Sequence, residues 1–249
     1  MKIRCAVDNY DREMSTYIVA YVDILGVASK MQQNTETQNQ SLNLLHNLFT
    51  QIIELSDGER GIKKYENIKI RIFSDNIIFA HKLSDNAVKR KDEIAILLNC
   101  VSNFACSAAG DHVGWLVRGG ITIGEFYIND TIIWGPALLR AYELEDKIAI
   151  YPRIVIDSTI ILELTKNKKV LEFISKDFDG AHYLNYMNIW HFAGESVKGG
   201  FEIIKSNALK LDGTYPDRIY QKLFWHMNYI NRELDKKNER KDKKYRLSL

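Results

Sequence analysis

The sequence predicts an α+β protein with a ferredoxin-like mixed β-sheet, covering helices and a C-terminal helical extension. Strand-type and helix-type segments alternate in the order β, α, β, β, α, β, α, β over roughly residues 16 to 160. Two consecutive strands in the middle of this series are joined by a tight turn, which indicates a mixed sheet with helices on one face. We expect one domain over residues 1–165 and, packed on it, a mostly helical extension over residues 166–249.

The composition fits a globular protein and says little about partners. Of the 249 residues, 46% are hydrophobic, which is enough for a substantial core. Lys and Arg number 34 and Asp and Glu number 32, and the net charge of +2 favours neither nucleic acid nor an acidic membrane as a partner. No apolar run approaches the roughly 20 residues of a membrane-spanning helix, and the three cysteines lack metal-site spacing. We expect a cytoplasmic protein without disulfides.

The first strand is expected at about residues 16 to 25 and carries one aspartate among apolar residues. Its period-2 alternation places Tyr21, Asp23 and Leu25 on one face. Gly26 ends the strand. The next helix covers this strand, because its apolar residues recur at helical spacing. These residues are Leu42, Leu45, Leu48, Phe49, Ile52 and Ile53.

A second aspartate is expected at the tip of a β-hairpin. Strands over residues 68–73 and 77–80 are joined by Ser74, Asp75 and Asn76, a composition typical of a tight turn. Asp75 therefore lies between two strands, as Asp23 lies near the end of one.

The later elements follow from glycine, proline and helical spacing. After a charged link over residues 89–92 and an apolar helix, a strand over residues 115–127 contains three glycines, which indicate close approach by a neighbouring backbone or ligand. Pro136 is placed for the first turn of the next helix. Residues 154–156 read as a short buried strand, and residues 166–192 look irregular.

Two features of the C-terminal third carry no predicted function. Residues 177–180, Asp-Phe-Asp-Gly, resemble the opening of a calcium loop, but the third acidic position is missing and Asn188 is the twelfth residue, so we expect no calcium. The basic run over residues 235–246 is interpreted as a solvated, frayed helix end rather than a nucleic-acid arm.

Asp23 and Asp75 are candidate metal ligands. A central strand does not bury a carboxylate without a partner, and two such aspartates invite a shared counter-charge. Mg²⁺ prefers hard oxygen ligands and is often held by one or two carboxylates plus substrate phosphates. The pair therefore predicts a phosphoryl-transfer site. The alternative is that each aspartate caps a strand end or accepts backbone hydrogen bonds in a turn.

Four segments carry a resemblance to a known family. They are Tyr-Val-Asp-Ile-Leu-Gly at 21–26, Phe-Ser-Asp-Asn at 73–76, Arg-Gly-Gly-Ile-Thr-Ile-Gly-Glu at 118–125 and Trp-Gly-Pro-Ala at 134–137. In this order and topology they resemble the class III nucleotidyl cyclase catalytic domain, most closely the Pycsar pyrimidine cyclases of bacterial anti-phage defence. The resemblance covers about residues 16 to 160.

The resemblance implies a ferredoxin-like core that works as a head-to-tail homodimer, with composite active sites between the subunits. It implies two Mg²⁺ or Mn²⁺ ions held by Asp23, Asp75 and the backbone carbonyl of Ile24. Backbone amides after the first strand would hold the triphosphate. These amides belong to Leu25, Gly26, Val27 and Ala28.

The chain departs from the family at the catalytic pair of the transition state. The family's Asn and Arg fall on Leu139 and Glu143, and neither side chain can do that work. Arg140 is the nearest cation on the same predicted helix. It either reaches the phosphates or makes a salt bridge on the surface or in the dimer interface, and the sequence leaves both open.

The positions that read the base in the family hold Arg71 and Ile132. An arginine without an acidic partner suits the carbonyl oxygens of a pyrimidine, because a guanidinium donates hydrogen bonds and cannot accept them. Tyr21 faces the same way as Asp23, so it would narrow the base pocket or stack on the ring.

The first expected function is therefore conversion of UTP or CTP to its 3′,5′-cyclic monophosphate and pyrophosphate. The product would be a messenger for a separate effector protein in anti-phage defence. Three alternatives stay open: an adenylate or guanylate cyclase, a catalytically inactive cyclase-like dimer that binds nucleotide or a partner protein, and a ferredoxin-like RNA-binding module, which would need exposed aromatics on its sheet.

Overall fold

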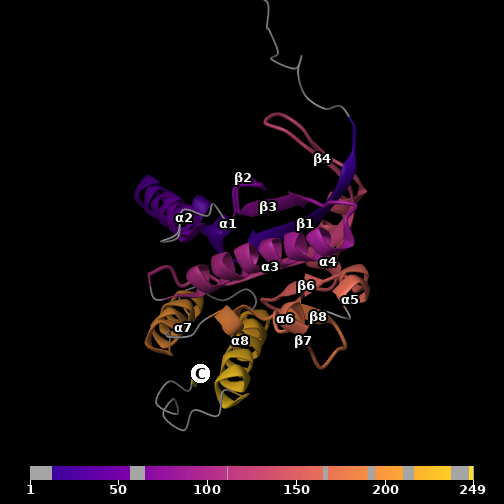
Figure 1. Cartoon of the computed structure of the whole chain (residues 1–249). Helices are drawn as coiled ribbons and strands as arrows, with labels where there is room; N and C mark the ends of the chain where they lie inside the picture. Colours follow the sequence, from indigo (N-terminus) through magenta and orange to yellow (C-terminus); the bar gives the residue numbers. More distant parts are fainter. Residues whose placement is uncertain are drawn as a thin grey trace, which may run out of the picture.

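The structure is a computed structural model that describes residues 13–56, 65–110, 112–164, 168–189, 194–209, 216–236 and 247–248. A central sheet runs through the molecule with helices packed on it (Figure 1). Its strands are β1 (Ser15–Ile24), β2 (Ile68–Phe73), β3 (Asn76–Lys82), β4 (Val117–Ile128), β5 (Ile133–Trp134), β6 (Ile154–Ile156), β7 (Ile174–Lys176) and β8 (His182–Leu184). Its helices are α1 (Val27–Met31), α2 (Thr35–Ser56), α3 (Ala87–Ala109), α4 (Pro136–Lys147), α5 (Ser158–Leu164), α6 (Lys168–Leu171), α7 (Gly194–Leu209) and α8 (Pro216–Lys236), with the 3₁₀ helix η1 (Tyr186–Ile189).

The first four long strands form a ferredoxin-like core. They lie in the order β2-β3-β1-β4, and each neighbouring pair is antiparallel. Helices connect β1 to β2 and β3 to β4, and a tight turn connects β2 to β3. The sheet becomes mixed at β6, which pairs with β4 in parallel. The predicted fold class, α+β with a ferredoxin-like mixed sheet, is confirmed.

The strands of the core bury side chains on both faces, which corrects the expectation of helices on one face. Along β1, even-numbered residues pack under α2 and α3, and odd-numbered residues pack under α4. The first group is Ile18, Ala20, Val22 and Ile24, and the second is Tyr17, Val19 and Tyr21. Because successive strand residues point to opposite faces, one apolar strand supplies two hydrophobic clusters.

Helix α3 begins earlier than its apolar pattern indicates. The Asn86 side chain accepts hydrogen bonds from the amides of Val88 and Lys89, which caps the N-terminus of the helix. The charged segment expected as a link, residues 89–92, therefore forms the first turns of α3. Further along, α2 and α3 meet the sheet through Phe49, Phe79 and Phe104, with ring centroids 5.5 to 6.4 Å apart.

The glycines of β4 allow α4 to lie directly on the strand. A Cβ atom added at Gly120 would stand 2.3 Å from the carbonyl oxygen of Ala141 in α4. On the other side of the strand, a Cβ at Gly119 would stand 2.5 Å from the carbonyl oxygen of Tyr21. The close backbone approach predicted from these glycines is therefore present on both sides of β4.

Within the segment 166–192, expected to be irregular, the described residues 168–189 contain two strands that extend the sheet. β7 and β8 pair with each other, and β8 pairs with β6 through Val155 and Tyr183. The fully buried Arg153 donates hydrogen bonds to the carboxylates of Asp177 and Asp179 in the turn between β7 and β8. These two carboxylates, which belong to the rejected calcium loop, therefore have an arginine as their partner.

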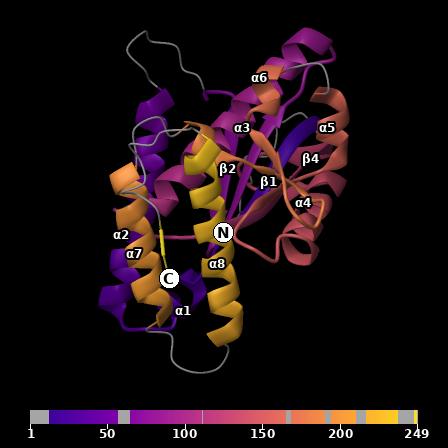
Figure 2. The ribbon, with the colours of Figure 1, turned by 90° about the horizontal axis from the view of Figure 1, so that it is seen from below.

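The two C-terminal helices lie side by side below the sheet (Figures 1 and 2). α7 contacts α3 and α8, and α8 adds Trp225 and Tyr229 to an aromatic cluster with Tyr151 and Tyr183. No helix in the described ranges is long and apolar enough to cross a membrane. Most of the basic run at 235–246 lies outside the described residues. The boundary at residue 165 stays a prediction.

Candidate functional site

Asp23 and Asp75 lie beside each other at one end of the sheet. Asp23 is opposite Asn76 in the β1–β3 ladder, and Asp75 occupies the turn just before Asn76. The amide of Ile24 donates to the carbonyl oxygen of Asp75 over 2.9 Å, which fixes the turn against the end of β1. The turn is sharp because Ser74 has a positive φ of 60°. The two aspartates, 52 positions apart in the chain, therefore share one corner of the fold.

Arg118 is the cation next to Asp23. It is opposite Asp23 in the β1–β4 ladder, and its Nε donates to Asp23 Oδ2 over 2.9 Å. Its Nη2 lies 2.7 Å from Oε1 of Glu145, a side chain of α4 that is only 4% exposed. This second contact is an ion pair without a hydrogen bond. One guanidinium thus holds two carboxylates.

Burial is the largest influence on the pKa values of Asp23 and Glu145. Burial raises the pKa of Asp23; the hydrogen bond and charge of Arg118 act against this, and the neighbouring charge of Asp75 adds to it. Burial likewise raises the pKa of Glu145, and Arg118 opposes it. A site in which carboxylates resist ionisation is one that gains from a further cation.

Tyr21 is a supporting residue of an aromatic wall beside Asp23. Its hydroxyl donates to Asn76 Oδ1 over 2.6 Å, and burial together with the charge of Glu145 raises its pKa to about 12. Its ring centroid lies 6.4 Å from that of Phe73 and 5.5 Å from that of Tyr142. Tyr21 is 9% exposed, whereas Phe73 and Tyr142 are each nearly half exposed. The more exposed rings are therefore those of Phe73 and Tyr142, and the predicted contact of Tyr21 with the base stays a prediction.

Arg71 has an acidic partner, which corrects the sequence-based argument about the base. Its Nη2 lies 2.7 Å from Asp130 Oδ1 and 3.0 Å from the carbonyl oxygen of Asn129, in the turn between β4 and β5. Ile132 belongs to the same turn; its amide donates to Asn129 Oδ1, and its side chain is 46% exposed. The structure thus brings Arg71 and the turn of Ile132 together.

Arg71 lies apart from the aspartates within one chain. It pairs with Ile78, which pairs with Tyr21, so Arg71 is two strands away from β1 on the same face of the sheet. Two strand spacings are roughly 10 Å. The acidic corner and the Arg71 position are therefore separate places on the face of the sheet against which α4 packs.

Arg140 is a salt-bridge residue in this structure, which corrects its expected role next to the phosphates. Its Nε lies 2.6 Å from Oδ2 of Asp157, a buried carboxylate just after β6, and its Nη1 lies 3.7 Å from Glu143. Burial acts to raise the pKa of Asp157, but hydrogen bonds from Thr159 and Arg140 outweigh it and lower that pKa. Of the two alternatives left by the sequence, the structure has the salt bridge.

The amides expected to bind phosphate are only partly available. The amide of Leu25 donates to the carbonyl oxygen of Leu116 over 2.9 Å, so Leu25 is not a phosphate donor in this conformation. Gly26 has the left-handed conformation, with φ of 83°, and α1 begins at Val27. The residue after β1 must be glycine-like to make this turn. Gly26 and Val27 stay predicted phosphate contacts.

The acidic corner fits a divalent cation of the magnesium type. Among the described residues, no group of three or more His, Cys, Asp or Glu side chains could hold a metal ion. Two carboxylates and the carbonyl oxygen of Ile24 are nevertheless the kind of partial ligand set that Mg²⁺ uses when substrate phosphates complete its coordination. Asp23 Oδ2 is occupied by Arg118, so Oδ1 is the oxygen that a cation would contact.

The sequence alone does not identify Arg118 and Glu145 as neighbours of Asp23. The one available signal was Glu145, a carboxylate that recurs with Leu138 and Ala141 at helical spacing and so falls on the face of α4 toward the sheet. Arg118 is visible only through the register between β1 and β4.

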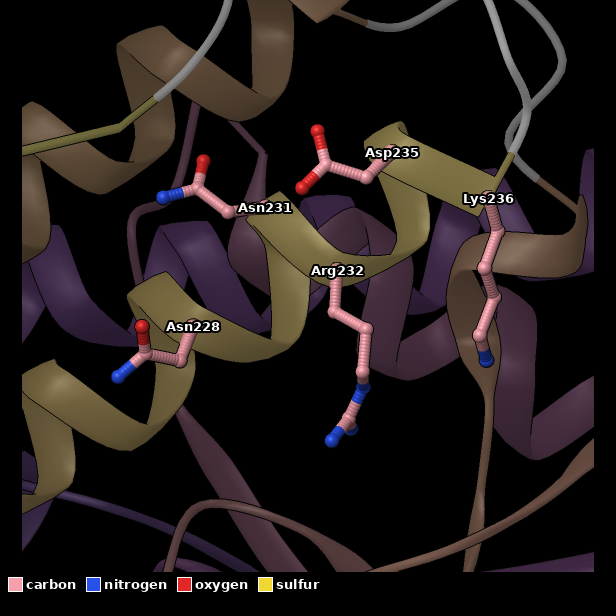
Figure 3. A pocket seen from close by; sticks show the side chains of 5 residues that line it. All are labelled: Asn228, Asn231, Arg232, Asp235 and Lys236. Atoms are coloured by element: carbon pink, nitrogen blue, oxygen red, sulfur yellow. The ribbon is translucent and has the colours of Figure 1, made fainter.

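A surface hollow of about 470 Å³ lies on α8 and not at the acidic corner (Figure 3). Its lining side chains come from this one helix and do not converge on a common point. Arg232 donates to the hydroxyl of Tyr183, and Lys236 pairs with Glu233. The hollow therefore adds no group to the candidate site. It is lined by Asn228, Asn231, Arg232, Asp235 and Lys236.

Comparisons with known proteins found similarity only among solved structures. No protein-family profile and no curated protein matches the chain. The monomeric guanylyl cyclase domain of the RhoGC fusion protein from the aquatic fungus Blastocladiella emersonii is 14% identical, with a TM-score of 0.45, and covers 69% of this chain and 95% of its own. The catalytic core of a rhodopsin-guanylyl cyclase with converted specificity, in complex with ATPαS, is 13% identical, with a TM-score of 0.44, and covers 70% of this chain and 97% of its own.

Proposed function

We propose that the chain is a nucleotidyl cyclase, which converts a nucleoside triphosphate to its 3′,5′-cyclic monophosphate and pyrophosphate. The observation that carries the proposal is the corner where Asp23 of β1 and Asp75 of the β2–β3 turn lie side by side, on a ferredoxin-like sheet. The resemblance of four sequence segments to the class III cyclases supports it.

The proposed reaction needs positioning and charge neutralisation more than covalent chemistry. A bond forms between the ribose 3′ oxygen and the α-phosphorus, the bond from that phosphorus to the pyrophosphate oxygen breaks, and the 3′ proton is released to solvent. Asp23, Asp75 and the carbonyl of Ile24 would hold two Mg²⁺ or Mn²⁺ ions, which when bound lower the pKa of the 3′ hydroxyl and neutralise the leaving oxygens. Arg118 holds the carboxylate of Asp23 in place.

We also propose a homodimer with composite active sites. The resemblance to the cyclases implies it, and Arg71 lies two strand spacings, roughly 10 Å, from Tyr21 on β1, the strand that carries Asp23. The chain also exposes large apolar side chains: Trp134 of β5 is 69% exposed, and Leu139 of α4 is 66% exposed. A second copy of this chain would cover them.

UTP or CTP is the proposed substrate, on the strength of the resemblance to the Pycsar enzymes. Arg71 gives weaker support than the sequence suggested, because its pairing with Asp130 sets an acceptor beside the guanidinium donors. An Arg and Asp pair can meet purine as well as pyrimidine edges. The proposed role as a messenger synthase with a separate effector in anti-phage defence likewise comes from the resemblance.

A second candidate function is a catalytically inactive, nucleotide-binding dimer. It is favoured by one observation: Leu139 and Glu143 occupy the family's transition-state positions, and the nearby Arg140 is engaged with Asp157. Such a protein would keep the metal corner and lose turnover.

One experiment separates these functions. Purified protein is incubated with each of the four ribonucleoside triphosphates and Mn²⁺, and cyclic products are sought by mass spectrometry. We expect product from UTP or CTP, and none from Asp23→Ala or Asp75→Ala, with unchanged circular dichroism. Asp92→Ala, an exposed aspartate of α3, is the control and keeps full activity.

The outcomes are distinct. Product from ATP or GTP alone would contradict the pyrimidine assignment. No product from any triphosphate, with Mn²⁺-dependent nucleotide binding retained, would identify the inactive dimer. Near wild-type turnover in either aspartate variant would contradict the metal assignment.

A further inference from the structure

Helix α8, far along the chain from the acidic corner, is packed against it. Leu223 of α8 is buried in a cluster with Leu116 and Ile204, and Leu25 packs on the same cluster. Leu25 is the residue directly after β1, and Leu116 is the residue directly before β4. The amide of Leu25 donates to the carbonyl of Leu116, so α8 rests on the two strand ends that carry Asp23 and Arg118.

Lys222, the neighbour of Leu223, is close enough to the corner to interact with its charged groups. Burial lowers the pKa of Lys222 and so does the charge of Arg118, while the charges of Asp23 and Glu145 raise it. In return, Lys222 lowers the pKa of both Asp23 and Glu145. Lys222 is half-buried, so it belongs to the corner and not to the open surface of α8.

The two cationic side chains of the corner, Arg118 and Lys222, differ in the partners that they have. Arg118 is committed through Nε to Asp23 and through Nη2 to Glu145. The side chain of Lys222, by contrast, makes no hydrogen bond or ion pair with any residue that the structure describes. A half-buried ammonium group near the carboxylates of Asp23 and Glu145, with its donors unused, is suited to an anionic ligand that arrives with its own metal ions.

We propose that Lys222 binds the phosphate groups of the nucleoside triphosphate, so that the C-terminal helix α8 completes the active site built by the sheet. The identity of the ligand rests on the proposed function. Lysine binds phosphate as a mobile point charge with three donors, and the divalent ions held by Asp23 and Asp75 would bring the triphosphate to this corner. The role assigns a function to the C-terminal extension, for which the sequence offers none.

Binding of inorganic tripolyphosphate tests the proposal without a nucleobase, a ribose or turnover. Its affinity is measured by isothermal titration calorimetry in excess Mg²⁺ for wild type, Lys222→Gln, Lys222→Met and Lys222→Arg. Lys236→Gln is the matched control, a lysine on the same helix that pairs with Glu233 over 2.8 Å. Lys222→Met keeps the apolar stem of the side chain if Lys222→Gln is poorly folded.

We expect the Gln and Met variants to bind tripolyphosphate about tenfold to a hundredfold more weakly, the range of one charged hydrogen bond. Lys222→Arg restores most of the affinity, and Lys236→Gln leaves it unchanged. In turnover assays the Gln variant raises KM more than it lowers kcat, because substrate and transition state share this contact.

Undiminished tripolyphosphate binding by folded Lys222→Gln or Lys222→Met overturns the proposal, as does failure of the wild type to bind tripolyphosphate. These results are independent of the proposed function. If the wild type makes cyclic nucleotide and the Lys222 variants bind tripolyphosphate normally, the cyclase proposal stands and the role of Lys222 is rejected. If the wild type makes no product and the variants lose tripolyphosphate binding, the role of Lys222 stands and the cyclase proposal is rejected.

Discussion

Replacing Arg118 with methionine removes the cation that two buried carboxylates share and keeps the aliphatic part of the side chain. Glu145 is 4% exposed and lies 2.7 Å from Arg118, and Asp23 is 13% exposed and lies 2.9 Å from it. Breaking a buried pair leaves an uncompensated charge, which costs about 3–5 kcal/mol. We expect Arg118→Met to lose about 3 kcal/mol of unfolding free energy at neutral pH, since Lys222 offsets part of the charge.

Arg90→Met is the matched control. Arg90 lies 2.7 Å from Glu163, the same distance as between Arg118 and Glu145, but Glu163 is 33% exposed. An exposed pair contributes about 0–1 kcal/mol. The two pairs have the same separation but differ in burial and in the number of carboxylates, since Arg118 also holds Asp23 and Arg90 binds Glu163 alone; the difference between the variants therefore reports both effects.

The loss of unfolding free energy caused by Arg118→Met is expected to depend on pH. Burial raises the pKa of Glu145 and Asp23, and Arg118 counteracts this, so its removal raises both pKa values further. A carboxyl with a raised folded-state pKa destabilises the protein above that pKa, and the penalty vanishes below the pKa of the unfolded chain. The loss of stability therefore shrinks as the pH falls from neutral into the acid range.

Urea unfolding followed by circular dichroism, at several pH values, gives the free energies directly. Glu145→Gln in the Arg118→Met background should recover most of the loss, as a double-mutant cycle. The reasoning is refuted if Arg118→Met costs no more than Arg90→Met, or if its cost is the same at all pH values.

Two further predictions concern the fold around the site. Gly120→Ala should lower the free energy of unfolding by about 3 kcal/mol or more, because the new Cβ would stand 2.3 Å from the carbonyl oxygen of Ala141. Gly124→Ala should leave it unchanged or raise it by about 0.5 kcal/mol, because the nearest contact of its Cβ is Ala137 Cβ at 3.4 Å. Equal melting temperatures of the two variants would contradict this. Burial lowers the pKa of His226 from 6.5 to about 3, so stability is full above pH 6.5 and falls by about 1.4 kcal/mol per pH unit toward pH 3. His226→Phe should reduce that slope in urea titrations, and an unchanged slope would show that another group titrates.

The position of each aspartate could be predicted because local rules determine it. Period-2 alternation in an apolar strand gives the face of Asp23, and the Ser-Asp-Asn turn places Asp75 at a hairpin tip. Pro136 and Gly26 mark element ends for reasons of backbone geometry that hold in any fold. Each of these expectations needed only residues that are close together in the sequence.

The partners of those residues could not be predicted, since they depend on register and on helix placement. A shift of one residue between β1 and β4 would turn Arg118 to the other face of the sheet. The pairing of Arg71 with Asp130 depends on where the β4–β5 turn lies, and that of Arg140 with Asp157 on the packing of α4 beside β6. These contacts join residues 17 to 95 positions apart.

By itself, the sequence determined the main elements over residues 16 to 160, their order and which side chains share a strand face, because hydrophobic spacing and turn residues act over short stretches of chain. Only the tertiary structure decided which charges meet. In the packed structure Glu145 and Lys222 lie near Asp23, and Arg71 and Arg140 have acidic partners. Helix α8 packs against the strand ends next to Asp23. Electrostatic pairing acts through space, and the distances through space between remote residues exist only once the sheet and its helices have packed.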